Sequence, residues 1–191
     1  MNAIPPAGRG SSALGLALAL AMALTRFHHF GSALQLLPDA SLAVFLLGGF
    51  YLRSAGWFGG YLALAALIDY LAIAYGGVSD WCVTPAYVFL VPAYGCAWGA
   101  GLWYARRSAP GWQTLGPLLG ALLAGVSAAF LVSNAGFYLF SGYFSDMSWT
   151  EYAARVARYY PPYLAGALFY VTLALGVHAL AAARRGLRQR A

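Results

Sequence analysis

Long apolar stretches, separated by short polar breaks, run through the whole chain. Six can be drawn, at residues 13–25, 40–52, 57–75, 85–104, 115–133 and 162–183. The last four approach the ~20 residues that an α-helix needs to cross ~30 Å of hydrocarbon. The first two are shorter, and they span only if flanking aromatic residues extend them or neighbouring helices shield them. The pattern predicts an all-α, polytopic membrane protein with a bundle of six transmembrane helices.

Composition agrees with lipid as the solvent. Of the 191 residues, 62% are hydrophobic and 8% are charged, whereas a soluble domain carries about a quarter charged residues. At this length, residues 1–191 are expected to form one transmembrane domain. The formal charge of +6 comes from scattered arginines, with no lysine. It therefore indicates membrane orientation and not a nucleic-acid partner.

Arginine placement orients the bundle. With the N-terminus inside, eight arginines fall on the inner side and Arg26, Arg155 and Arg158 fall outside. The positive-inside rule then predicts an N-in, C-in protein. We expect its membrane to be of the bacterial inner type. A cleaved signal peptide is the alternative for the first stretch, because Arg9 precedes an apolar run with small residues near its end.

Asp69 is the one acidic residue inside a predicted span. A carboxylate in that position is costly and usually faces a partner or water. We expect it to be protonated and hydrogen-bonded to a neighbouring helix.

The predicted outer loops are the elaborate ones. They cover residues 26–39, 76–84 and 134–161, whereas the inner loops at 53–56 and 105–114 are short. The third outer loop is rich in aromatic residues, among them Tyr143, Phe144 and Trp149, which suit a large, flat, amphipathic ligand. An interfacial aromatic belt is the alternative. Within that loop, residues 149–160 have helical spacing and could lie flat as a lid.

The second outer loop contains Asp80, Trp81 and Cys82, and the first contains His28 and His29. A thiolate and a histidine pair on one face suggest a site for a ligand that carries a metal. An inert loop thiol, and histidines that only bond within their loop, are the alternatives. Cys96 lies 14 residues beyond Cys82, about 21 Å along a helix, which is too far for a disulfide. The sequence has no CxxC, HxxxH or HExxH pattern, so an independent metal site is unsupported.

Several blocks of the sequence resemble the BtuM-like family of small membrane proteins proposed to take up vitamin B12. These blocks are Thr25–Ala33, Leu37–Ser41, Leu47–Arg53 and the Asp80–Pro85 segment around Cys82. The family is similar to the substrate-binding S-components of energy-coupling-factor transporters. The resemblance implies a six-helix fold that holds its ligand at the outer face through loops one, three and five.

The implied ligand is cobalamin, bound as substrate. Corrin supplies four equatorial nitrogens, so Cys82 alone could serve as an axial cobalt ligand in a base-off form, and its thiolate could labilise an opposite cyanide. His28 or His29 would approach the other corrin face or its rim. The remaining implied contacts are Asp80, Trp81, Tyr143, Phe144 and Trp149.

The sequence has no Walker A pattern and no catalytic set. Uptake would therefore use a separate energy-coupling ATPase module, or none. Two other classes stay open. One is a membrane-bound haem or quinone redox protein that uses His28 or His29 with His178. The other is a non-catalytic membrane assembly protein.

Overall fold

The computed structural model of the chain describes residues 9–26, 37–107 and 112–188, and these residues are helical throughout with short connections. In chain order the elements are α1 (Arg9–Arg26), α2 (Ser41–Tyr51), α3 (Ala55–Gly76), η2 (Pro85–Phe89), α4 (Leu90–Arg107), η3 (Trp112–Thr114), α5 (Leu115–Phe140), α6 (Trp149–Ala157) and α7 (Tyr160–Arg188). The predicted all-α class is confirmed over these ranges.

Three of the described helices are long and apolar enough to cross a membrane: α3, α5 and the Tyr160–Ala181 part of α7. The buried share of their apolar windows is 28% in α3, 39% in α5 and 17% in α7. The Ser12–Arg26 part of α1 and the whole of α2 are apolar but shorter. The chain is thus of the membrane type, and the number of its spans stays a prediction.

The faces that the helices leave uncovered are apolar. On α1, Leu16, Leu20 and Leu24 follow one another at helical spacing and are about 60% exposed. Leu173 and Val177 on α7 are similarly exposed. Exposed apolar stripes of this kind are typical of surfaces that contact lipid or another protein.

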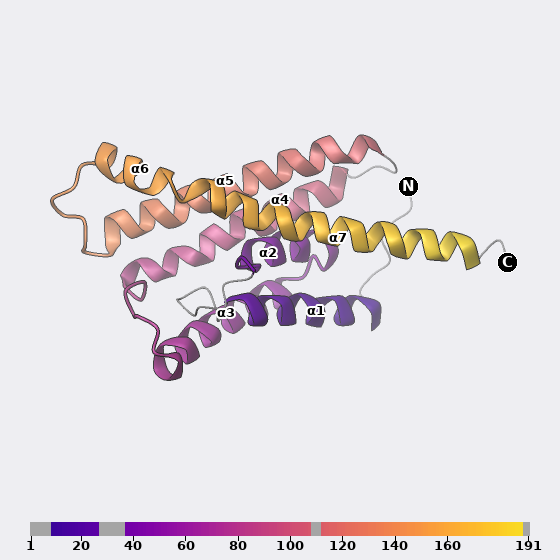
Figure 1. Cartoon of the computed structure of the whole chain (residues 1–191), viewed down its shortest axis with the longest axis horizontal. Helices are drawn as coiled ribbons and strands as arrows, with labels where there is room; N and C mark the ends of the chain where they lie inside the picture. The colour runs from indigo at the N-terminus through magenta and orange to yellow at the C-terminus, as the bar shows by residue number, and fades with distance from the viewer. Residues whose placement is uncertain (1–8, 27–36, 108–111, 189–191) are drawn as a thin grey trace.

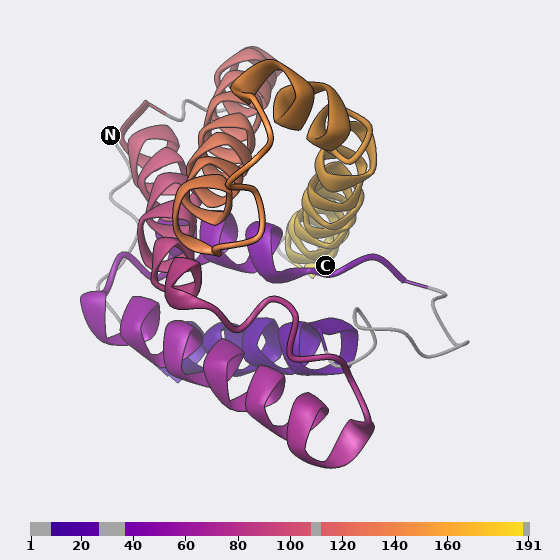
Figure 2. The ribbon, with the colours of Figure 1, turned by 90° about the vertical axis from the view of Figure 1, so that its left-hand side faces the viewer.

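Helix α2 lies at the centre of the bundle. All nine residues from Ser41 to Gly49 are buried, and the helix contacts α1, α3, α4, α5 and α7. Figures 1 and 2 show it enclosed between the α4–α5 layer, α7 and the α1–α3 pair. A helix that is apolar all round is the kind that a core can bury completely.

Glycines set the distance between α2 and α4. A Cβ on Gly101 would collide with the Leu46 carbonyl, and one on Gly49 would collide with the Trp98 carbonyl. The two backbones therefore cross in direct contact, as small residues allow in membrane bundles. This close crossing brings the Trp98 ring over Gly48 and fills the core.

The predicted end of the fifth stretch is wrong for an identifiable reason. The stretch predicted to end at residue 133 continues as α5 to Phe140. Ser133 and Asn134 do not end the helix because both side chains donate to the Phe130 carbonyl. The fourth stretch begins as the 3₁₀ segment η2, where Thr84 accepts a hydrogen bond from the Ala86 amide.

The two ends of the bundle differ. Figure 1 shows α1 beginning and α7 ending at one end, which also holds the arginines after α2 and at the end of α4. The opposite end, which faces the viewer in Figure 2, carries the 77–84 loop, the 141–148 loop and α6. The sequence-based grouping of these two loops on one face agrees with this arrangement.

Candidate functional site

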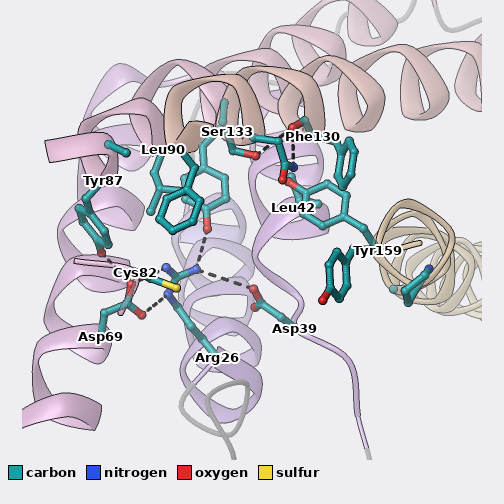
Figure 3. A pocket seen from close by; sticks show the side chains of 18 of the residues that line it. Arg26, Asp39, Leu42, Asp69, Cys82, Tyr87, Leu90, Phe130, Ser133 and Tyr159 are labelled. Carbon is teal, nitrogen blue, oxygen red and sulfur yellow. Dashed lines mark hydrogen bonds and ion pairs between the residues drawn. The ribbon is translucent and has the colours of Figure 1, made fainter. Parts of the chain in front are cut away.

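A cavity of about 610 Å³ opens at the end that carries these loops. Its walls come from α1, the 38–42 segment, α3, the Cys82 loop, η2, α4, α5 and the start of α7. The charged and thiol residues gather at one side, and tyrosine and phenylalanine rings line much of the rest (Figure 3). The volume lies within the ~300–1,000 Å³ typical of small-molecule sites.

The charged side of the cavity is built around Arg26, the last residue of α1. Its Nε donates to Asp69 Oδ1 at 2.7 Å and its Nη2 donates to Asp69 Oδ2 at 2.6 Å. Its Nη1 donates to the Tyr94 hydroxyl at 2.6 Å and to the Ser41 hydroxyl at 3.1 Å. The guanidinium thus joins α1 to α2, α3 and α4 at a single buried point.

Asp69 is paired with a guanidinium from another helix. Both of its oxygens accept hydrogen bonds from Arg26, and Oδ2 also accepts one from the Tyr87 hydroxyl at 2.7 Å. The Arg26 and Asp69 side chains are only 6% and 5% exposed. The two parallel hydrogen bonds have the bidentate geometry that guanidinium and carboxyl groups adopt with one another. The expected bond to a neighbouring helix is present, with Arg26 of α1 as the donor.

Asp39 is the second carboxylate of the cavity. Its Oδ1 accepts hydrogen bonds from the Ser41 amide at 2.9 Å and from the Ser41 hydroxyl at 2.7 Å. It therefore sits at the N-terminus of α2, where the helix dipole favours negative charge. Its Oδ2 lies 3.7 Å from Arg26 Nη1, and the side chain is 21% exposed.

Cys82 is an exposed residue of the 77–84 loop that nevertheless lines the cavity. Figure 3 shows its sulfur beside the Arg26–Asp69 pair. Partial burial of the thiol raises its pKa, the Asp69 charge raises it further, and the Arg26 charge opposes the shift. In the ligand-free protein Cys82 is accordingly a neutral thiol at neutral pH, available to a metal that can displace its proton.

Trp81 and Asp80 share the Cys82 loop but are exposed and do not line the cavity. The Trp81 ring stacks on the Tyr143 ring, with centroids 3.8 Å apart and planes 8° apart. The loop that carries the thiol is in this way attached to the loop that follows α5.

The predicted aromatic contacts of the third outer loop pack chiefly on one another. Phe144 contacts Phe137, Tyr138 and Tyr152, and Trp149 lies against Tyr138 with centroids 4.1 Å apart. None of Tyr143, Phe144 and Trp149 lines the cavity, and neither does any residue of α6. Phe137, which Phe144 contacts, does line the cavity, so Phe144 packs behind a lining residue.

Helix α6 forms over much of the segment for which helical spacing was predicted. It is capped by Ser148, whose amide and hydroxyl donate to Glu151 Oε2 at 2.9 and 2.6 Å. These two hydrogen bonds lower the pKa of the Glu151 carboxyl. Tyr152 is buried on its inner side, where its hydroxyl donates to the Asn134 carbonyl. The helix connects the loop after α5 to α7, as Figure 2 shows.

The remaining candidate residues from the sequence are the three histidines and Cys96. His28 and His29 lie outside the described residues. His178 is an exposed residue of α7 near Tyr51, at the arginine-bearing end of the bundle. Cys82 and Cys96 are both free, which confirms that they are not bridged. Cys96 is half-buried in α4 and packs against the core.

Sequence reasoning did not identify Arg26, Asp39, Tyr87 and Tyr94 as cavity residues. The available signal was the pair of opposite charges at Arg26 and Asp69, each at or inside an apolar stretch. Because a charge in that setting requires a partner, the two could have been joined from sequence. No such signal exists for the tyrosines, which are numerous in the chain.

The fold and the cavity together define an all-helical bundle of the membrane type with a charged cavity at one end. No protein-family model matches the chain, and no curated protein matches it in sequence.

Proposed function

We propose that this chain is a membrane transporter that binds cobalamin at its outer face and mediates its uptake. The Cys82 thiolate would be an axial cobalt ligand on base-off cobalamin. The supporting observation is that the Cys82 thiol lines an open, aromatic-rich cavity at one end of a membrane-type bundle.

A single thiolate donor suits a metal that is already held by an organic ligand. Among the described residues, no group of three histidine, cysteine or acidic side chains is arranged to hold a metal ion. A corrin already occupies the equatorial positions of its cobalt, so a single soft donor is sufficient. The thiolate would also weaken a cyanide on the opposite face, so ligand exchange on the bound substrate would accompany uptake.

The size of the cavity is compatible with a corrinoid that extends partly outside it. A corrinoid is larger than the ligands that a cavity of about 610 Å³ usually encloses. It would project through the mouth beside Cys82 and Tyr159, both of which are exposed. The contacts predicted for Trp81, Tyr143, Phe144, Trp149 and Asp80 would then be made by the part outside the cavity.

The proposed topology has six spans with both termini inside, in a bacterial-type inner membrane. The arginines at the end opposite the cavity support this orientation. A reporter fused after Ala191 should be cytoplasmic, and a reporter there on the outer side would place the cavity inside. Energy would come from a separate coupling ATPase, or uptake would proceed unaided with trapping inside.

One observation weighs against the haem or quinone alternative. His178 lies near Tyr51 and does not line the cavity, so it does not contact a haem bound there. The assembly-protein alternative predicts no response to small molecules.

The deciding experiment is the visible spectrum of purified protein that has been incubated with cobalamin and then desalted. Retained corrinoid absorbance, together with a higher unfolding temperature, supports the proposal. A Soret band that changes with dithionite would support the redox alternative. Absence of both bands, with an unchanged unfolding temperature, would favour the assembly protein.

A further inference from the structure

The charges that line the cavity do not balance. Its described lining holds one guanidinium, Arg26, and two carboxylates, Asp69 and Asp39, which gives a formal charge of one negative unit. The Cys82 thiol adds no positive charge to this count. The interior therefore carries an excess negative charge in surroundings of low polarity, where charges interact strongly.

The excess resides on Asp39. Asp69 is paired in two hydrogen bonds with Arg26 and is 5% exposed, whereas Asp39 is four times as exposed and its Oδ2 is 3.7 Å from the guanidinium. That distance exceeds a hydrogen bond. Asp39 is thus the carboxylate that a ligand in the cavity can reach.

The uncharged walls complement a cation as well. Six aromatic rings line the cavity: Tyr87, Tyr94, Phe130, Phe137, Tyr159 and Tyr163. The faces of such rings attract cations, and the attraction grows when water is excluded. We propose that the cavity binds the cationic part of its ligand, held between the Asp39 carboxylate and these rings.

The cavity should bind an anionic ligand weakly. The Arg26 guanidinium is buried and already donates to Asp69, Ser41 and Tyr94. Among the described lining residues, an anion would therefore meet the charge of Asp39 and no accessible cation.

For a corrinoid, an extension that rests on the proposed function, the consequence is selectivity between axial ligands. The cobalt(III)–corrin core is cationic, and each anionic axial ligand lowers its charge by one unit. With the Cys82 thiolate on one face, water on the other keeps the metal centre more positive than cyanide does. The cavity should then favour aquocobalamin over cyanocobalamin, and Asp39 should be the residue responsible.

Asp39→Asn is the test variant, because asparagine can still accept the Ser41 hydrogen bonds while the charge is removed. Asp80→Asn is the matched control, since Asp80 is an exposed carboxylate at the same end that does not line the cavity. Tetraphenylphosphonium and tetraphenylborate are suitable probes, because they share a shape and differ in the sign of their charge. Binding is measured as protection of Cys82 from alkylation in a Cys96→Ser background.

We expect the unsubstituted protein and Asp80→Asn to bind the phosphonium equally well. Asp39→Asn should bind it about tenfold more weakly, which corresponds to a loss of about 1.4 kcal/mol in binding free energy. Its affinity for the borate should not fall. Equal phosphonium affinity in Asp39→Asn and Asp80→Asn would overturn the inference, whatever the outcome with corrinoids.

The corrinoid arm separates the two proposals. The ratio of aquocobalamin to cyanocobalamin affinity should fall in Asp39→Asn and not in Asp80→Asn. Equal ratios would overturn the extension to corrinoids. Failure of every variant to bind either corrinoid would overturn the proposed function, and the phosphonium comparison would still decide the role of Asp39.

Discussion

The indole of Trp81 lies flat on the ring of Tyr143, with the two ring centroids 3.8 Å apart. Both side chains are about half exposed, so the stack lies at the surface of the bundle. It joins the loop that carries Cys82 to the loop that follows α5. The position of the thiol at the cavity therefore depends on a contact between segments some sixty residues apart in sequence.

The first prediction concerns this stack. Trp81→Ala and Tyr143→Ala should be coupled, because each removes the partner of the other. A double-mutant cycle on the free energy of unfolding should give an interaction energy of about 0.5–1.5 kcal/mol between the two side chains. Tyr75→Ala with Trp81→Ala is the control, since Tyr75 is 79% exposed and outside this contact. Additive effects in both cycles would show that the stack contributes nothing.

The second prediction concerns the cobalt ligand. Cys82→Ser should abolish the thiolate-type corrin spectrum and any loss of cyanide, because a serine hydroxyl is a poor donor for this purpose. Cys96→Ser should change neither, since Cys96 packs in α4 away from the cavity. Absorbance of the desalted complexes is the measurement. A wild-type spectrum from Cys82→Ser would rule out axial ligation by this residue.

The third prediction is a pH profile. Because the pKa of Cys82 is raised, its alkylation rate in ligand-free protein should rise at higher pH than that of an ordinary thiol, whose pKa is about 8.5. Denaturing the protein in SDS should move the midpoint back down. A folded midpoint at or below the denatured one would contradict the burial of the thiol. The measurement uses a Cys96→Ser background, so that Cys82 is the cysteine that is alkylated.

A related consequence holds for ligand binding, because coordination by the thiolate releases a proton. The apparent affinity for a corrinoid should increase with pH up to the raised pKa and level off above it. The same titration on Cys82→Ser should be flat over this range, which makes that variant the control.

The fourth prediction concerns the buried ion pair. Arg26→Met or Asp69→Leu alone should lower the free energy of unfolding by about 3–5 kcal/mol, because each leaves an unpaired buried charge. The double variant should recover much of that loss. Arg155→Ala, on the exposed side of α6, serves as the control. Single variants no worse than this control would show that the pair is dispensable.

The fifth prediction tests the helix crossing at α2. Gly101→Ala should destabilise the protein strongly, because the added methyl collides with the Leu46 carbonyl, whereas Gly99→Ala has open space around it. Thermal unfolding in detergent compares them directly. The expected cost for Gly101 is about 1–3 kcal/mol, the usual range for overpacking. An equal effect at both glycines would contradict the close approach.

Local patterns predicted much of the helical framework. The second stretch, predicted at residues 40–52, forms α2 at Ser41–Tyr51, because its apolar run and polar flanks are both sharp. The end of α5 was missed because Ser133 and Asn134 can be accommodated by hydrogen bonds to the preceding turn. Whether a polar residue ends a helix depends on such contacts, which hydropathy alone does not encode.

The cavity was predictable only in part. Cys82 was singled out by its residue type and its outer loop, and it does line the cavity. Trp81, Tyr143, Phe144 and Trp149 were expected to surround the ligand, and this stays a prediction. In the structure Trp81 stacks on Tyr143, whereas Phe144 and Trp149 pack on the neighbouring rings of Phe137 and Tyr138. Aromatic residues satisfy each other as readily as they bind a ligand, so composition cannot distinguish these arrangements.

The central position of α2 bears on how the protein is made. At 11 residues the helix is about 16 Å long, roughly half the thickness of a bilayer core, and α4 and α7, which enclose it, follow it in the chain. Arg26 likewise cannot form its ion pair with Asp69 until that residue, 43 positions further along the chain, has been translated. Helix α2 can therefore reach its enclosed position only after α4 and α7 have been translated.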